Sequence, residues 1–154
     1  MKTLLAILTL VAAPAFAGAA AAHDVKQDKQ RGDEADREAI KVVIQDYFDG
    51  IGAADRARLD RAFAVDNAAM VGMVKTDAGG EMRAFKDMDA VIANWASNEA
   101  PEGVGRDGEI LDMMITDGRI AAVMFRYKDE YYDVLTLLKV GGEWKIATKT
   151  FLQR

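Results

Sequence analysis

Three charged residues in the second half of the chain have the side-chain types and the spacing of a small-molecule site. They are Glu109, Arg126 and Asp133, and each interrupts a stretch rich in apolar strand formers. An arginine between two carboxylates on a half-buried surface has two interpretations. It is a structural ion pair that closes the mouth of a barrel, or it is the polar anchor at the end of an apolar pocket.

The turns between the last four strands set the register that brings these residues together. Asp117-Gly118 and Gly141-Gly142 have the composition of two-residue hairpin turns, and we take Asp129-Glu130 as the third turn. Counting residues outward from these turns places the three charged residues in one row across the sheet.

Strand alternation predicts which side chains share the face of that row. Apolar residues dominate this face, which is therefore the better candidate for a concave side covered by helices. They are Leu111, Met113, Ile115, Ile120, Ala122, Met124, Leu135, Leu137, Trp144 and Ile146. Thr148 and Thr150 lie at the polar end of the same face, whereas Lys145 and Lys149 are predicted on the opposite face.

Helices must supply the other wall of such a pocket, and their patterns precede most of the strands. Apolar residues recur with helical spacing in a first helix that ends at Gly50 and Gly52 and in a later helix that follows Asp87. These residues are Ile40, Val43, Ile44, Tyr47, Phe48 and Ile51, then Met88, Val91, Ile92 and Trp95. Asp55 and Asp87 are predicted N-caps. Helices followed by an antiparallel meander predict an α+β fold with one face of a curved sheet covered.

The amino-terminal part of the sequence has the pattern of a secretory signal peptide. Lys2 precedes the short apolar run 4–13, and Ala15-Phe16-Ala17 has the small residues of a cleavage site. We therefore expect a signal peptide over residues 1–22, cut after one of the residues 17–22. A disordered arm over 23–33 and a single domain over 34–154 are expected to follow. This pattern predicts a periplasmic or secreted protein with no membrane insertion after the signal is removed.

Composition excludes several classes of site. The chain has no cysteine, so it has no disulfide and no thiolate metal site, and His23 is its single histidine. The net charge is −5 with 20 basic and 25 acidic residues, which is not the pattern of a nucleic-acid-binding protein. No motif for a metal or an organic cofactor is present, so we expect neither.

Two stretches carry a resemblance to a known family. With "VIQDYFDGIGAADRARLDRAF" early and "YYDVLTLLKVGGEWKIATKTF" at the end, the chain resembles the nuclear transport factor 2-like superfamily from about Glu34 to Phe151. The branch it resembles is the small bacterial proteins described as putative lumazine-binding. The resemblance implies a cone, in which a strongly bent antiparallel sheet wraps around three N-terminal helices and a pocket.

The superfamily includes ketosteroid isomerase, and the comparison with that enzyme is instructive. Tyr47 resembles its helix-one tyrosine, an oxyanion donor, and Asp133 lies near its neutral oxyanion-hole aspartic acid. Its general base would fall near Val71 or Gly72, where this sequence has no acid. The resemblance therefore argues against a proton-abstracting isomerase of that type, and the preferred interpretation of Tyr47 is a core tyrosine with its hydroxyl at the rim of the pocket.

Three functional hypotheses follow. The first is a domain that binds a small, partly apolar molecule in the cone, through Tyr47, Trp95, Glu109, Met124, Arg126, Asp133, Leu135 and Thr148. The second is a lyase, cyclase or isomerase in which Asp133 is the acid or base and Tyr47 the donor. The third is a homodimer formed through the outer sheet face, with Tyr132, Val134, Leu138 and Phe151 as apolar contacts. The sequence leaves open whether the protein catalyses a reaction.

Overall fold

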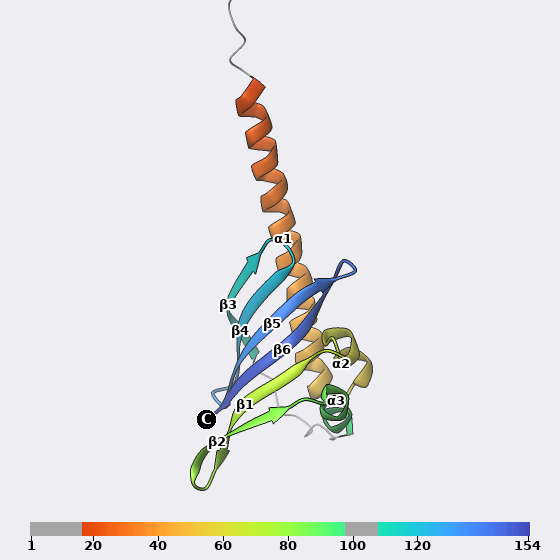
Figure 1. Cartoon of the computed structure of the whole chain (residues 1–154), viewed down its shortest axis with the longest axis vertical. Coiled ribbons are helices and arrows are strands. Elements are labelled where there is room, and N and C mark those ends of the chain that lie inside the picture. The colour runs from red at the N-terminus through yellow and green to blue at the C-terminus, as the bar shows by residue number, and fades with distance from the viewer. Residues whose placement is uncertain (1–16, 98–107) are drawn as a thin grey trace, which may run out of the picture. The chain divides into compact units, whose positions relative to one another are not determined.

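The structure is a computed structural model that describes residues 17–97 and 108–154, with side chains from residue 33 onward. It falls into two units, Met1–Arg31 and Gly32–Arg154, and all the described strands belong to the second (Figure 1). In the first unit, the described residues are helical. Most of the predicted signal peptide lies outside the described residues, and it stays a prediction.

The first helix, α1 (Ala17–Gly52), starts earlier than the apolar pattern predicts. Residues 23–33, for which we expected a disordered arm, are helical instead. Lysine, glutamine and arginine supply five of these eleven residues, and all three have good helix propensity. The predicted end of the helix at Gly52 is confirmed, and its apolar face packs into the core through Ile40, Ile44 and Tyr47.

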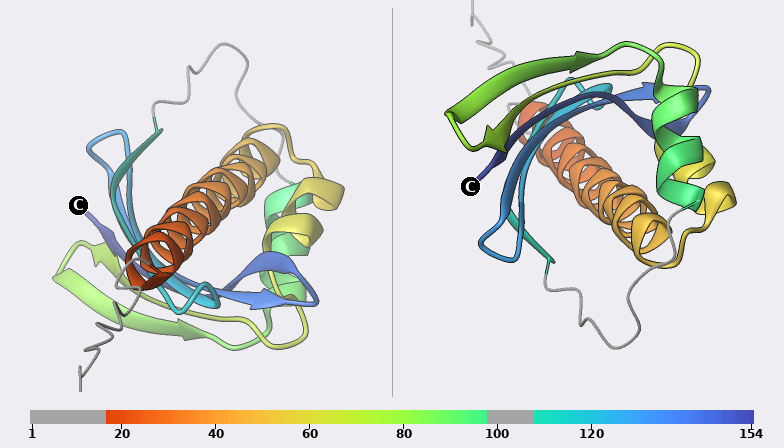
Figure 2. Two further views of the ribbon diagram at one scale, coloured as in Figure 1. Left: turned by 90° about the horizontal axis from the view of Figure 1, so that it is seen from above. Right: turned by 90° about the horizontal axis from the view of Figure 1, so that it is seen from below.

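Two short helices complete the helical layer. In α2 (Arg56–Ala62), the N-cap Asp55 accepts a hydrogen bond from the backbone N–H of Arg58, as its sequence predicts. In α3 (Met88–Ser97), the Asp87 carboxylate accepts one from the N–H of Ala90 at 2.9 Å. α2 and α3 contact each other and stack at one end of the sheet (Figure 2).

The six strands form one bent sheet that curves around the Gly32–Gly52 part of α1 (Figure 2). They are β1 (Ala69–Thr76), β2 (Gly79–Phe85), β3 (Gly108–Thr116), β4 (Ile120–Tyr127), β5 (Tyr131–Val140) and β6 (Glu143–Gln153). Their order is β2-β1-β6-β5-β4-β3. Neighbouring strands are antiparallel except β1 and β6, which pair in parallel and make the sheet mixed. The α+β cone fold is thus confirmed.

The inward and outward positions of β4 are shifted by one residue relative to the prediction. Thr116 pairs with Ile120, so the turn at Asp117-Gly118 has three residues instead of two, and Tyr127 pairs with Tyr131 across another three-residue turn. A slip of one residue moves each side chain of a strand to the other face. Ala121, Val123 and Phe125 therefore point into the core, whereas Ile120, Ala122 and Met124 face outward.

In β6, a β-bulge changes which side chains point inward. Val140 pairs with Glu143 across the Gly141-Gly142 turn, as predicted, but the register with β5 shifts between Leu137 and Thr136. Trp144 and Ile146 point inward before the bulge, and Lys149 points inward after it. The prediction that Lys149 lies on the outer face is therefore wrong.

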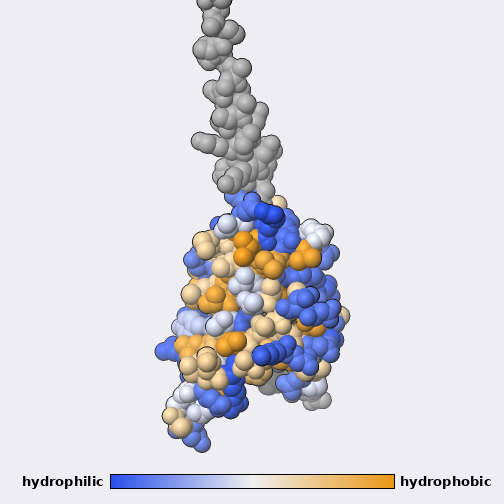
Figure 3. Space-filling view, in the orientation of Figure 1, coloured by the Kyte–Doolittle hydropathy of each residue, from blue (hydrophilic) through white to orange (hydrophobic). Residues whose placement is uncertain are grey.

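The core fills the concave side of the sheet, and its convex side carries apolar residues that remain exposed. Figure 3 shows this convex side, where apolar side chains lie among polar ones over the strands. Exposed apolar residues on β3, β4 and β5 include Leu111, Met114, Ile120, Met124, Val134 and Leu138.

Candidate functional site

A cavity of about 820 Å³ opens between the concave side of the sheet and the helices. Its size falls within the range of small-molecule sites. Eight of its twenty lining residues are aromatic: Tyr47, Phe48, Phe85, Trp95, Phe125, Tyr127, Tyr131 and Phe151. Lys86, Asp87, Glu130 and Gln153 contribute polar groups, and Asp133 and Lys149 contribute the buried ones.

Ring contacts fix the positions of these aromatic residues. The ring of Tyr47 packs edge-on against Phe63 at 5.5 Å between centroids and also contacts Trp95 at 6.1 Å. On the other side, Tyr127 stacks on Tyr131, which in turn contacts Phe151. Such contacts hold a flat apolar surface in place before any ligand arrives.

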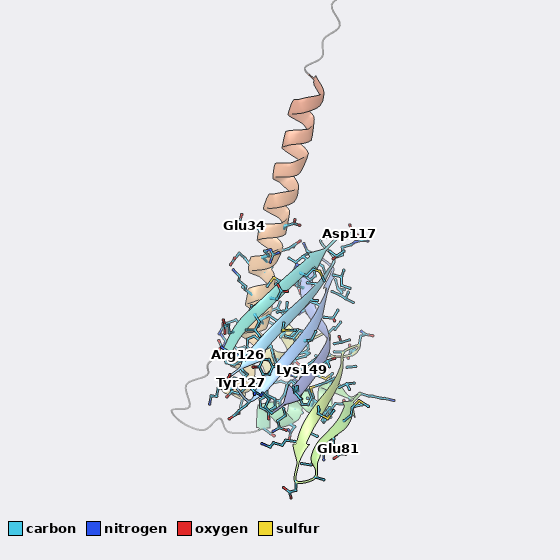
Figure 4. All side chains as sticks on the ribbon, turned by 90° about the vertical axis from the view of Figure 1, so that its left-hand side faces the viewer. Glu34, Glu81, Asp117, Arg126, Tyr127 and Lys149 are labelled. Carbon is cyan, nitrogen blue, oxygen red and sulfur yellow. The ribbon has the colours of Figure 1, made fainter. Side chains whose placement is uncertain are left out.

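Tyr47, Asp133 and Lys149 form a buried polar cluster on the cavity wall. The Tyr47 hydroxyl donates to Oδ2 of Asp133 at 2.8 Å, and Nζ of Lys149 donates to the Tyr47 oxygen at 2.8 Å. Nζ of Lys149 also forms an ion pair with Oδ2 of Asp133. Oδ1 of Asp133 is buried and has no hydrogen-bond partner among the residues that the structure describes. Figure 4 shows Lys149 among the side chains in the body of the domain.

Helix α1 and the bulge in β6 bring the cluster together. Tyr47 belongs to the buried face of α1, and Asp133 lies at an inward position of β5. Lys149 is paired with Leu135, two residues further along β5, which places its side chain diagonally from Asp133. Nζ lies 5.2 Å from the ring centre of Tyr47 and 5.1 Å from that of Phe151, so aromatic faces also surround the cation.

Burial changes the protonation equilibrium of Lys149 in this cluster. It lowers the pKa of the Lys149 ammonium below its usual value, although the charge of Asp133 and its hydrogen bond act in the opposite direction. Burial also raises the pKa of the Tyr131 phenol, and the nearby Glu130 and Asp133 carboxylates add to this effect. Burial thus disfavours the charged forms of the Lys149 amine and the Tyr131 phenol.

The structure divides the residues that the sequence predicts for this site into two groups. Tyr47, Trp95 and Asp133 line the cavity together. Leu135 lies in the core behind it, whereas Met124 and Thr148 face outward and are exposed. Met124 faces outward because the turns on either side of β4 have three residues, and Thr148 faces outward because of the bulge in β6.

The predicted row of Glu109, Arg126 and Asp133 is half right. Glu109 does pair with Arg126 across β3 and β4, and the two side chains form an ion pair at 2.6 Å. Arg126, however, lies opposite Tyr132, while Asp133 lies opposite Phe125. Arg126 therefore points to the outer side with Glu109 and Asp129, and the interpretation of this pair as part of the pocket is wrong.

Lys149, Phe151 and Phe125 are among the site residues that sequence reasoning missed. A signal for Lys149 and Phe151 exists in β6: the apolar inward positions are even-numbered at Trp144 and Ile146 but odd-numbered at Phe151. A change of parity within one strand requires a bulge. Phe125 gave no such signal, because both faces of β4 are apolar in the sequence.

The packing of Gly72 against Phe151 leaves no room for the side chain of an isomerase base at position 72. Gly72 pairs with Phe151, and a Cβ at this position would lie 2.1 Å from the Phe151 ring. Phe151 thus occupies the space that any side chain at position 72 would need.

Among the described residues, no group of three or more potential metal-binding side chains comes together, and no helix is long and apolar enough to cross a membrane.

Comparisons with known proteins agree with this architecture. The model of a family described as putative lumazine-binding matches residues 35–152. A search of curated proteins finds no match. A solved structure of an NTF2-like protein of unknown function from Silicibacter pomeroyi is 24% identical, with a TM-score of 0.65, and the match covers 76% of this chain and 94% of that one.

Two further solved structures support the same fold. An NTF2-like protein of unknown function from Methylobacillus flagellatus is 20% identical, with a TM-score of 0.65 over 78% of this chain and 93% of that one. A ketosteroid isomerase-like protein from Erwinia carotovora is 17% identical, with a TM-score of 0.54 over 75% of this chain and 94% of that one. At these identities, the likeness concerns the fold alone.

Proposed function

We propose, on the premise that this chain belongs to the putative lumazine-binding family of the NTF2-like superfamily, that the domain binds a small, partly apolar molecule in its cavity. The observation that carries the proposal is the cavity of about 820 Å³, with its aromatic wall and its buried cluster of Tyr47, Asp133 and Lys149. Apolar walls with a few converging polar groups are the usual form of such sites.

The charges of the cluster narrow the chemistry of the ligand. Lys149 and Asp133 neutralise each other, so the buried end of the cavity has no net charge to attract a strong anion or cation. A neutral head group that both donates and accepts hydrogen bonds suits this pair, because Oδ1 of Asp133 is an acceptor without a described partner. A flat body would stack on Phe151 and Tyr131.

Calorimetric titration with two probes tests the proposal. Lumazine, which the family's description suggests, is a flat heterocycle with such a head group, and 2-naphthalenemethanol is a neutral aromatic alcohol. We expect saturable one-site binding of at least one probe. Phe151→Ala should weaken it by about tenfold, since an aromatic contact of this kind contributes about 1.5 kcal/mol.

Leu152 provides a matched control for that variant. It is the next residue of β6, points to the other side of the sheet and does not line the cavity. Leu152→Ala should bind the probes like the wild type. The proposal is wrong if neither probe binds saturably, or if the two alanine variants lose affinity equally.

A second candidate function is self-association through the convex side of the sheet. Met124 and Val134 are paired across β4 and β5, and both are exposed, with Leu138 and Ile120 as exposed apolar neighbours. These side chains support a homodimer, because an apolar surface of this kind is favourable to cover. Of the four predicted contact residues, Tyr132, Val134 and Leu138 lie on the outer side of β5, whereas Phe151 lines the cavity instead.

Sedimentation velocity tests this candidate. The wild type should sediment as a dimer at micromolar concentration, and Met124→Lys should sediment as a monomer with an unchanged circular dichroism spectrum. A wild type that stays monomeric at high concentration would exclude the homodimer.

A further inference from the structure

Lys149 combines two properties that the proposed binding of a ligand does not require. Its side chain is only 7% exposed, whereas those of Lys41 and Lys139 are 54% and 31% exposed. It also lies on the wall of a cavity, next to a carboxylate and a phenol. A buried amine beside a proton acceptor is the arrangement that activates a lysine as a nucleophile.

We infer that Lys149 forms an imine with an aldehyde or ketone group of a molecule bound in the cavity, with Asp133 as the group that takes up and returns the proton. This inference rests on the proposed function, because the carbonyl compound must first enter the cavity. It adds to that function the chemical class of the ligand and a covalent step.

The first requirement is a neutral amine. Transfer of one proton from Nζ of Lys149 to Oδ2 of Asp133, its ion-pair partner, converts two buried charges into two neutral groups. Burial favours the neutral form of the Lys149 amine, since an ammonium loses more solvation than a neutral amine. The lowered pKa of Lys149 has the same cause and makes more free amine available at neutral pH.

The covalent step then balances without any further reagent. The lone pair of Nζ attacks the carbonyl carbon, the carbonyl oxygen gains a proton from nitrogen, and a carbinolamine results. The acid form of Asp133 gives its proton to the carbinolamine hydroxyl, which leaves as water. The product is an iminium cation at Lys149 next to the Asp133 carboxylate, so the charges of the starting ion pair are restored.

Tyr47 is placed to assist the attack. Its oxygen lies 2.8 Å from both Nζ of Lys149 and Oδ2 of Asp133. Once Oδ2 carries a proton, the phenol can turn its own hydrogen toward the carbonyl oxygen that develops negative charge. The rings of Phe151 and Tyr47 flank Nζ and limit the access of water to the imine.

Reductive labelling tests the inference on the wild-type protein. The probe is 2-naphthaldehyde with sodium cyanoborohydride, which reduces an iminium to a stable secondary amine, and peptide mapping by mass spectrometry locates the label. At pH 7 we expect Lys149 to be labelled several-fold faster than the exposed Lys41 and Lys75, which do not line the cavity, because the cavity holds the aldehyde beside the Lys149 amine and burial favours the neutral form of that amine. An excess of 2-naphthalenemethanol should protect Lys149 and leave the exposed lysines reactive.

The outcomes separate this inference from the proposed function. If 2-naphthalenemethanol binds saturably but the aldehyde labels exposed lysines and spares Lys149, the imine is excluded and the binding site stands. If neither the alcohol nor the aldehyde occupies the cavity, both proposals are wrong. At a saturating concentration of the aldehyde, where a loss of affinity no longer affects the rate, Asp133→Asn should label Lys149 several-fold more slowly than the wild type, which distinguishes proton transfer from a role in binding alone.

Discussion

Two ion pairs on neighbouring strands have similar chemistry and opposite surroundings. In the pair of Lys149 with Asp133, the side chains are 7% and 2% exposed, whereas in the pair of Arg126 with Glu109 they are 37% and 55% exposed. Asp133 and Arg126 occupy consecutive cross-strand positions, opposite Phe125 and Tyr132. A single step along the strand therefore decides which pair faces the cavity and which faces solvent.

This difference shows that burial determines how strongly the stability of the protein depends on an ion pair. Two charges in the interior lose their hydration, and their attraction repays this loss only with good geometry, so such pairs contribute little net stability. A pair at the surface loses less hydration and is also weak. The buried pair is nevertheless sensitive to change, because removing one partner leaves the other charged and unpaired.

A third pair lies between these extremes. Asp36 of α1 accepts hydrogen bonds from Lys139 on β5 and from Nε1 of Trp144 on β6, and the side chains of Asp36 and Lys139 are 12% and 31% exposed. If burial determines the loss of unfolding free energy on mutation, that loss should be largest for the pair of Lys149 with Asp133, intermediate for Lys139 with Asp36, and smallest for Arg126 with Glu109.

The largest effect is expected for Lys149→Met. The variant leaves the Asp133 carboxylate buried without its cation, which should lower the free energy of unfolding by about 3–5 kcal/mol. Urea denaturation followed by circular dichroism at pH 7 measures this change. A loss no larger than that of a surface substitution would contradict the comparison.

The double variant Asp133→Leu/Lys149→Met controls for the cause of that loss. It removes both charges and fills the space with apolar groups, so it should recover most of the stability of the wild type. If the double variant loses as much unfolding free energy as Asp133→Leu and Lys149→Met together, the loss in Lys149→Met does not come from the unpaired Asp133 carboxylate, and the comparison is wrong.

Asp36→Ala should have an intermediate effect. It leaves Lys139 and the buried indole N–H of Trp144 without an acceptor, which should lower the free energy of unfolding by about 1–3 kcal/mol. Asp36→Asn keeps an acceptor for Trp144 and should lose less. Urea denaturation of both variants checks the ranking, and an alanine variant as stable as the wild type would break it.

The burial of Lys149 should also make the stability depend on pH, with a smaller effect than the substitutions above. An unfolded lysine holds its proton up to about pH 10.4, whereas buried Lys149 releases it at a lower pH. Between these two values the unfolded chain binds more protons, so the free energy of unfolding rises with pH, by at most about 1.4 kcal/mol per pH unit.

The double variant serves as the reference for this measurement, since it lacks both members of the titrating pair. The stability of the wild type relative to the double variant should increase from neutral pH toward about pH 10.4. A difference that stays constant or falls over this range would show that the pKa of Lys149 is not lowered.

The fold was predictable from the sequence because several independent sequence signals indicate it. The site was predictable only in part, because some of its residues depend on a single feature of the backbone. The helical spacing around Tyr47 and the caps at Asp55 and Asp87 each have an independent cause in the sequence. The inward position of Asp133 follows from alternation within β5 alone. Its true partner, Lys149, depends on a bulge, and the outward position of Arg126 depends on the length of two turns. Neither feature has a strong local signature, since one extra residue in a turn or strand changes little in composition.

The smallest effect is expected for Arg126→Gln, which breaks the exposed pair. Arg126 contacts Glu109 and Asp129 in solvent, where water and salt replace most of what the ion pairs provide. Its unfolding midpoint in urea should match the wild type within error in 0.5 M salt (on the order of a 4 Å screening length), and its affinity for the cavity probes should be unchanged because Arg126 does not line the cavity. A clear loss of probe affinity would restore the row that the sequence suggested and overturn the division between the inner and the outer pair.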